Sequence, residues 1–311
     1  MAGQFGIYTG TMNGAVGSLL TVLDAVLVTG AGWSKPAGLI GTNQAAYLSA
    51  GTCPIYLNVN DNGPGAASGL EARITGYETM SAPGTGTNAF PTAAQGVGGV
   101  AAYCVRKSSA AGTARSYIAF ADAGTIYFFV QSDGTFYTGF LFGEFDSKSS
   151  SDTWRQFIAA RYTENQSSGQ YDSLDVIDAT INVNTYDSTM GVADRTYTGA
   201  PGGMSIILRK QVDTAMYDWS ARRYLGIGAI PYPNNPDGRI YVSQIRLFET
   251  SYIYRGTMRG LWASNHPVAS FNDGDTFSGT GTLTGRTFRI VKPSGNGGLF
   301  VVETSATLTT P

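Results

Sequence analysis

The chain has 311 residues with 20 basic and 22 acidic side chains, which gives a net charge of −2. This balance excludes a protein held to nucleic acid by bulk charge. A charged fraction of 14% with 12% aromatic residues excludes a disordered chain. Glycine accounts for 41 residues, nearly double the usual share of roughly 7%. The length fits two domains or one large all-β unit with a sizeable core.

The N-terminal part predicts the one clear helix, near 18–29. Ser18 is a candidate N-cap, and Gly30 is a stop signal. One helical face collects the apolar residues Leu19, Leu20, Leu23, Val26 and Leu27. A pair of buried strands is the alternative. The first five residues lack the cationic region of a signal peptide, and the apolar stretch 15–29 is too short and polar to span a bilayer.

Most of the remaining chain is typical of short strands between Gly-, Asn-, Asp- and Ser-rich turns. The strand predictions cover 53–59, 70–77, 117–121, 125–131, 135–142, 205–208, 239–248, 287–291 and 299–303. Residues 122–124 are predicted to form a hairpin turn, 152–158 a weaker second helix and 83–99 a long loop. The pattern predicts a mainly β fold of sandwich or barrel-like units with one short N-terminal helix and a small C-terminal β module.

Charge is distributed unevenly along the chain. The first 70 residues contain only Asp24, Lys35 and Asp61 as charged side chains, whereas an ordinary solvated surface is about a quarter charged. We expect much of this segment to be buried, in the chain's own core or against other subunits. We predict a main β-rich domain over 1–257 and a C-terminal β module over 258–311.

Metal-binding patterns are weak. The one histidine, His266, and the two cysteines, Cys53 and Cys104, have spacings that match no zinc motif, and we interpret them as structural residues. The segments 58–63 and 272–275 imitate parts of calcium loops, but Asx-rich turns explain them better. No metal and no cofactor is expected.

Catalytic patterns are equally weak. No lysine follows a glycine as in a phosphate-binding loop, and no Gly-x-Ser-x-Gly motif occurs. The carboxylates of Asp172, Asp175 and Asp178 cluster in sequence. In an extended chain Asp172 and Asp178 would lie about 20 Å apart, whereas glycosidases need roughly 5–9.5 Å. We therefore predict that the chain is not an enzyme.

Arginine and aromatic residues suggest protein–protein contact. Arginine outnumbers lysine 15 to 5, and Arg, Tyr and Trp are enriched at interfaces, where Lys is depleted. A compositional bias of the organism is the alternative. The candidate interface residues are Trp219, Arg222, Arg223, Tyr224, Arg255, Arg259 and Trp262.

Several segments together point to a known family. They are 17–20, 23–25, 28–30, 32–36, 41–47, 72–80, 90–92, 255–262, 271–277, 285–288 and 302–305. In this order they resemble a family of virion structural proteins of tailed bacteriophages. Arg259 stands where that family usually has proline, so the turn before Gly260 is expected to differ. The region 146–235 shows little resemblance, and no catalytic residue is implied.

The resemblance implies a non-enzymatic virion component, made in the bacterial host cytoplasm. Its expected place is the tail, the baseplate or fibre attachment, or the neck. We expect a homo-oligomer that binds other virion proteins, without nucleic acid or membrane insertion. The alternatives are a head decoration protein, a module that binds a receptor or host-surface glycan through loops near 146–170 or 185–203, and a glycan depolymerase.

Overall fold

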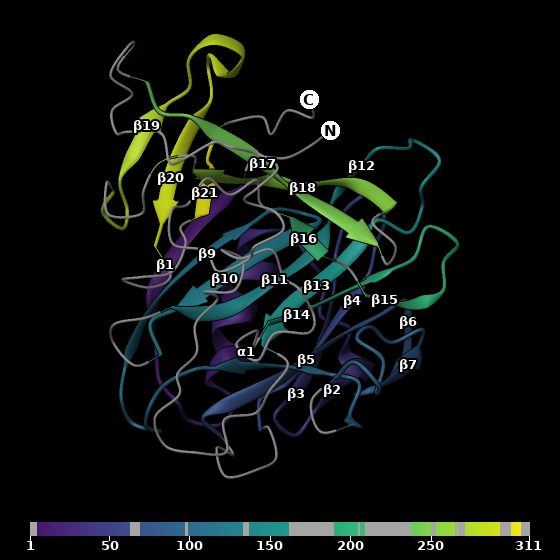
Figure 1. The fold of residues 1–311 in the computed structure, drawn as a ribbon. Coiled ribbons are helices and arrows are strands. Elements are labelled where there is room, and N and C mark those ends of the chain that lie inside the picture. The colour runs from purple at the N-terminus through teal and green to yellow at the C-terminus, as the bar shows by residue number, and fades with distance from the viewer. Residues whose placement is uncertain are drawn as a thin grey trace.

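The computed structural model describes residues 5–62, 69–96, 99–132, 137–161, 190–204, 206–208, 237, 239–249, 253–264, 266, 271–292 and 300–305. These residues form two large antiparallel sheets in a sandwich-like arrangement, with one short α-helix (Figure 1). The predicted mainly β fold class is confirmed. No described helix is long and apolar enough to cross a bilayer.

The first sheet has 12 strands within the described residues. Its spatial order is β1 (Gly6–Met12), β9 (Arg115–Ala121), β10 (Thr125–Val130), β11 (Thr138–Glu144), β13 (Gln156–Arg161), β8 (Tyr103–Arg106), β5 (Glu71–Tyr77), β4 (Tyr56–Asn60), β3 (Gln44–Leu48) and β2 (Ile40–Gly41). β14 (Met190–Arg195) also pairs with β13, and β15 (Pro201–Met204) follows β14. Within the described residues this branched sheet therefore ends at β1, with seven residues, at β2, with two, and at β15, with four.

The second sheet has seven strands within the described residues. Its order is β16 (Ile206–Leu208), β17 (Val242–Glu249), β18 (Ile253–Ser264), β21 (Phe300–Glu303), β20 (Thr287–Val291) and β19 (Thr276–Ser278), and β12 (Asp146–Ser147) pairs with β18. In Figure 1 these green-to-yellow strands lie above the teal strands of the first sheet. The boundary predicted at residue 258 falls inside β18. β6 (Thr79–Ala82) and β7 (Thr85–Thr87) form a separate hairpin.

β10 shows why the core has two layers. Side chains of a strand alternate between its faces, so Phe128 points into one apolar cluster while Tyr127 and Phe129 point into another. The first cluster includes residues of α1 and of both halves of the first sheet. The second lies between the two sheets, where Phe129 packs against Phe300 of β21 with ring centroids 5.5 Å apart. A strand buried on both faces explains its continuous apolar run.

The predicted N-terminal helical segment is confirmed, but its predicted N-cap residue is wrong. α1 (Ser18–Leu23) continues as a π-helix, η1 (Asp24–Gly30), and the predicted apolar face packs into the first cluster. In the described part of the chain, the 3₁₀ turns η2 (Ala37–Leu39) and η7 (Gly281–Leu283) occur after η1. The N-cap is Gly17, not Ser18, and its φ of 85° suits glycine. The carboxylate of Asp61 instead accepts the Leu19 N–H at 2.8 Å.

Two local predictions were wrong. The second helix predicted over 152–158 is an irregular segment over 152–155 followed by β13, because Phe157 and Ile158 are buried on opposite faces of the sheet. The long loop predicted over 83–99 contains β7 and a bridge between Phe90 and Gly76, which buries the Phe90 ring fully. The hairpin turn at 122–124 is confirmed, with the N–H groups of Gly124 and Thr125 each donating to the Asp122 carboxylate at 2.9 Å.

Candidate functional site

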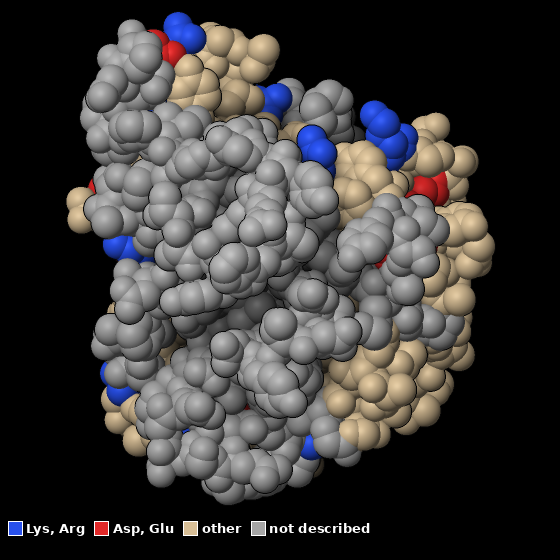
Figure 2. Space-filling model, viewed as in Figure 1, with Lys and Arg blue, Asp and Glu red and all other residues tan. Residues whose placement is uncertain are grey.

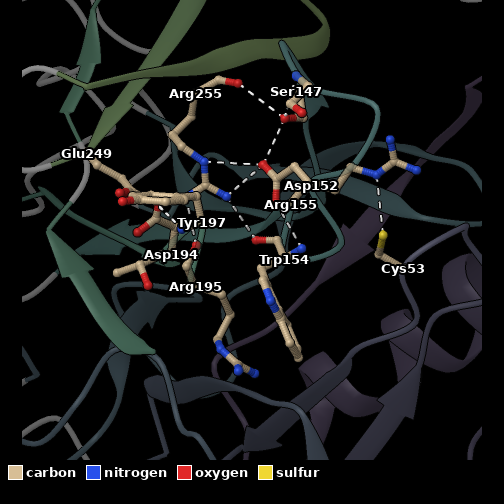
Figure 3. Close-up of polar contacts among 12 residues, drawn as sticks. Cys53, Ser147, Asp152, Trp154, Arg155, Asp194, Arg195, Tyr197, Glu249 and Arg255 are labelled. Atoms are coloured by element: carbon tan, nitrogen blue, oxygen red, sulfur yellow. Dashed lines mark hydrogen bonds and ion pairs between the residues drawn. The ribbon is translucent and has the colours of Figure 1, made fainter. Parts of the chain in front are cut away.

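A buried arginine gathers three carboxylates where the two sheets meet. Arg255 lies on β18, Glu249 on β17 and Asp194 on β14, and Asp152 precedes β13. We call these four residues the Arg255 cluster. Figure 3 shows the Arg255 guanidinium between Asp152 on one side and Asp194 and Glu249 on the other. Each of the four side chains is less than a tenth exposed.

All three guanidinium nitrogens of Arg255 donate hydrogen bonds. Nη2 donates to Asp152 Oδ2 at 2.8 Å and Nε donates to the same oxygen at 3.2 Å. Nη1 donates to the Arg195 carbonyl at 2.9 Å and to Glu249 Oε1, and it lies 3.5 Å from Asp194 Oδ2. A planar guanidinium with several fixed donors suits this kind of buried multidentate pairing.

The ion pairs of the Arg255 cluster hold parts of the fold together. A general acid or base must reach a substrate proton. These carboxylates are instead buried and paired with Arg255. Asp194 belongs to the first sheet and Glu249 to the second, so the ion pairs fasten one sheet to the other. Removing the cation would leave buried carboxylates uncompensated, which is strongly destabilising.

The β14–β15 turn is held against this cluster. The Arg195 guanidinium lies 4.5 Å from the Trp154 ring centroid and donates to Glu78 Oε2 at 2.9 Å. The Tyr197 N–H donates to Glu249 Oε1 at 2.7 Å, and the Tyr197 side chain is 59% exposed. Asn88 and Arg195 hold the pKa of the Glu78 carboxyl below its usual value. The cluster therefore fixes a turn that presents one tyrosine to solvent.

A second ion pair joins the sheets through Arg259. Its Nη2 lies 2.9 Å from Asp122 Oδ2, and its carbonyl accepts the Tyr127 hydroxyl at 2.6 Å. The Asp122 carbonyl accepts the Trp33 indole N–H at 2.7 Å. Burial raises the pKa of the Asp122 carboxyl, although Arg259 acts to lower it. These bonds tie the β9–β10 hairpin to β18.

The structure places the seven candidate interface residues in two groups. Trp219, Arg222, Arg223 and Tyr224 lie outside the described residues. The other three are buried on β18: Arg255 is 4% exposed, Trp262 is 7% exposed and Arg259 is 8% exposed. These three are therefore used inside the chain, where Trp262 donates its indole N–H to Glu303 at 3.3 Å. Arginine content alone does not distinguish an internal ion pair from a surface contact.

The partners of Arg255 were missed by the sequence analysis. Asp152 lies 103 residues from Arg255 in the chain. No spacing pattern links residues that far apart, so only the fold reveals the cluster. The aspartates weighed as a catalytic group, Asp172, Asp175 and Asp178, lie outside the described residues.

The single histidine and the two cysteines do not come together as a metal centre. His266 is 2% exposed, and its Nε2 accepts the Tyr241 N–H at 2.7 Å. Cys53 is half-buried with Arg155 Nε donating to its Sγ at 3.3 Å, and Cys104 is buried on β8. In the described part of the chain, no group of three or more His, Cys, Asp or Glu side chains is arranged to hold a metal ion.

The two calcium-like segments are held by protein groups. The Asn58 side-chain oxygen accepts from Gln44 Nε2 at 3.1 Å and from the Gly84 N–H at 3.2 Å. Asp273 accepts the Tyr137 hydroxyl at 2.9 Å and the Lys292 N–H at 3.0 Å. The described residues of both segments are thus held by hydrogen bonds to other parts of the chain.

In the described part of the face in Figure 2, Lys and Arg side chains (blue) and Asp and Glu side chains (red) are seen at a few separate places. An open groove of about 560 Å³ lies where β1 ends and α1 begins. Its lining residues are all uncharged: Thr11, Met12, Asn13, Ala15, Val16, Gly17, Ser18, Thr21, Val22 and Ala114.

Comparison of the sequence with known protein families finds no matching family, and comparison with curated proteins finds no matching relative.

Proposed function

We propose that this chain is a non-enzymatic structural component of a tailed-bacteriophage virion, in the tail, the baseplate or fibre attachment, or the neck. The observation that supports the proposal is the low charge of the first 70 residues. Of their three charged side chains, Asp61 is buried in a pair with Lys107, and Asp24 and Lys35 form a partly exposed pair with each other. A surface with so little charge favours contact with other subunits over solvation.

The internal use of charge supports the same proposal. The Arg255 cluster and the Arg259–Asp122 pair connect the two sheets, and their side chains are buried. A rigid sandwich fastened at several points suits a subunit that must keep its shape in a particle. The segments that resemble virion structural proteins supply the choice of particle.

A receptor- or glycan-binding module of the same virion is the second candidate. It is favoured by three exposed tyrosines, Tyr197 at 59%, Tyr241 at 38% and Tyr254 at 38%. Exposed aromatic rings with a polar tip suit the apolar faces of sugars and the surfaces of partner proteins alike. Decoration of the head is a further location for the structural role.

The direct test follows the chain through purification of the particles. Particles from cells that produce the chain are banded in a density gradient, and the chain is quantified by mass spectrometry against known capsid and tail proteins. We expect a fixed number of copies per particle in the banded fraction. A chain that remains in the soluble fraction of the lysate contradicts the proposal.

Two further assays separate the alternatives. Light scattering of the recombinant chain at several concentrations measures its native mass, and a fixed oligomer supports a self-assembling component. Glycan-array binding that is lost in Tyr197→Ala, but kept in the control variant Ile40→Ala of another exposed apolar side chain, would favour the glycan-binding module. Release of sugar from host polysaccharide would contradict the non-enzymatic role.

A further inference from the structure

The first sheet ends in an open strand. β1 pairs with β9 through seven consecutive residues, Gly6 to Met12, without a bulge. Among the described residues no strand pairs with its other side. Ile7, Thr9, Gly10 and Thr11 are all exposed. In an antiparallel sheet, alternate residues of such a strand direct their N–H and C=O groups away from the sheet.

This edge lacks the devices that usually prevent strand pairing. Natural edges are kept short, charged, bulged or interrupted by proline. The other edges of the two large sheets are short in the described residues, with two residues in β2, three in β16, three in β19 and four in β15. β1 is seven residues long and contains no charged residue and no proline. An edge left in this state is suited to accept another strand.

The residue order of β1 fits a second copy of itself. Antiparallel pairing about a two-fold axis at Thr9 aligns all seven residues with their counterparts in the second copy. Each larger side chain then opposes a smaller one. Ile7 opposes Thr11, Tyr8 opposes Gly10 and Met12 opposes Gly6. Two threonines meet at the centre, a favourable cross-strand pair, and no like charges are brought together.

Resting on the proposed structural role, we infer that two copies of this chain join through their β1 strands into one continuous antiparallel sheet. The surface beside β1 supports a self-contact larger than the strand alone. Ile7 is 44% exposed and Val16 is 42% exposed, and Val16 lines the uncharged groove together with Thr11. Apolar side chains next to the paired strands help the contact reach the roughly 1,200 Å² typical of stable interfaces.

The first test places a charge at the centre of the pairing. Thr9→Lys brings two ammonium groups opposite each other, whereas the exposed Thr85 of β7 provides the matched control Thr85→Lys. Sedimentation velocity of the full chain at several concentrations measures the dimer dissociation constant. We expect Thr9→Lys to raise it roughly tenfold or more and Thr85→Lys to leave it unchanged. Equal thermal midpoints of the two variants would show that the fold is intact.

The second test reads the register by disulfide formation. Residues directly opposite in an antiparallel pair have Cα atoms about 4.5–5.5 Å apart, within the range a disulfide requires. In a Cys53→Ser background, Thr9→Cys is expected to form a covalent dimer under mild oxidation. Ile7→Cys on the same edge should not, because position 7 opposes position 11 of the second copy.

The outcomes separate this inference from the proposed function. A dimer weakened by Thr9→Lys and locked by Thr9→Cys supports β1 pairing. A monomeric wild-type chain, an oligomer unaffected by Thr9→Lys, or equal crosslinking of Thr9→Cys and Ile7→Cys overturns it. Recovery of the chain in banded particles after any of these results would leave the structural role standing, with another surface or another protein as the contact.

Discussion

Replacing Lys107 with methionine removes the cation from a fully buried ion pair. The side chains of Lys107 and Asp61 are each 0% exposed and pair directly. Lys107 Nζ also donates to the Ala15 carbonyl at 2.7 Å, and the Asp61 carboxylate caps α1 at the Leu19 N–H. The pair thus anchors the start of the helix to the β4 and β8 ends of the first sheet.

The expected cost of Lys107→Met is about 3–5 kcal/mol, because it leaves a buried carboxylate without its counter-ion. That is a large part of the roughly 5–15 kcal/mol that stabilises a folded protein. In the double variant Asp61→Leu/Lys107→Met no charge stays buried. It loses the helix cap, worth about 1 kcal/mol, and should be more stable than Lys107→Met alone. Urea unfolding followed by tryptophan fluorescence measures the midpoints.

The matched control is Lys35→Met, which breaks the partly exposed pair with Asp24. Such pairs contribute about 0–1 kcal/mol, so its midpoint should stay near that of the wild type. The reasoning is refuted if the double variant is destabilised by the sum of the two single changes. That result would mean that Lys107 and Asp61 act independently of each other.

Three further predictions concern the joints between the sheets. Arg255→Met should destabilise the chain by about 3–5 kcal/mol or more, whereas Arg246→Met, on the exposed side of β17, should cost less than about 1 kcal/mol; urea midpoints compare them. Tyr127→Phe should cost about 1–3 kcal/mol, because the buried Arg259 carbonyl loses its 2.6 Å hydroxyl donor, and an unchanged midpoint would argue against that bond. Burial raises the pKa of the Glu303 carboxyl, so the folded chain binds the carboxyl proton more tightly than the unfolded chain does. As the pH falls through the raised pKa toward the usual value of 4.5, the wild type should therefore gain stability relative to Glu303→Gln. A loss of stability over that pH range would contradict the raised pKa.

Local sequence patterns located some of the elements, whereas β1, β3, β8 and β18 fall outside every predicted strand range. The alternation in 70–77 and the aromatic run 125–131 correspond to β5 and β10, and the apolar face beginning at Leu19 corresponds to α1 and η1. Such patterns succeed because each side chain's direction follows from its neighbours within a few residues. They failed at 152–158, where a helical period cannot be told from a strand buried on both faces.

The polar contacts needed the tertiary structure. The sequence identified Arg255 and Arg259 as notable arginines and assigned them to an interface. The fold instead buries both beside carboxylates far away in the chain. The Asp61 cap of α1 comes from 42 residues beyond Leu19, so no capping pattern around Ser18 could reveal it.

By itself the sequence determined the mainly β class, the N-terminal helix and the scarcity of charge in the first 70 residues, since all three depend on composition and short-range periodicity. Only the tertiary structure decided which strand stands at an edge and which charges are internal. Strand order and ion pairing join residues that are distant in the chain, and their energies depend on burial that no local pattern encodes. The open β1 edge is therefore a property of the folded sheet, although every residue that makes it uncharged is visible in the sequence.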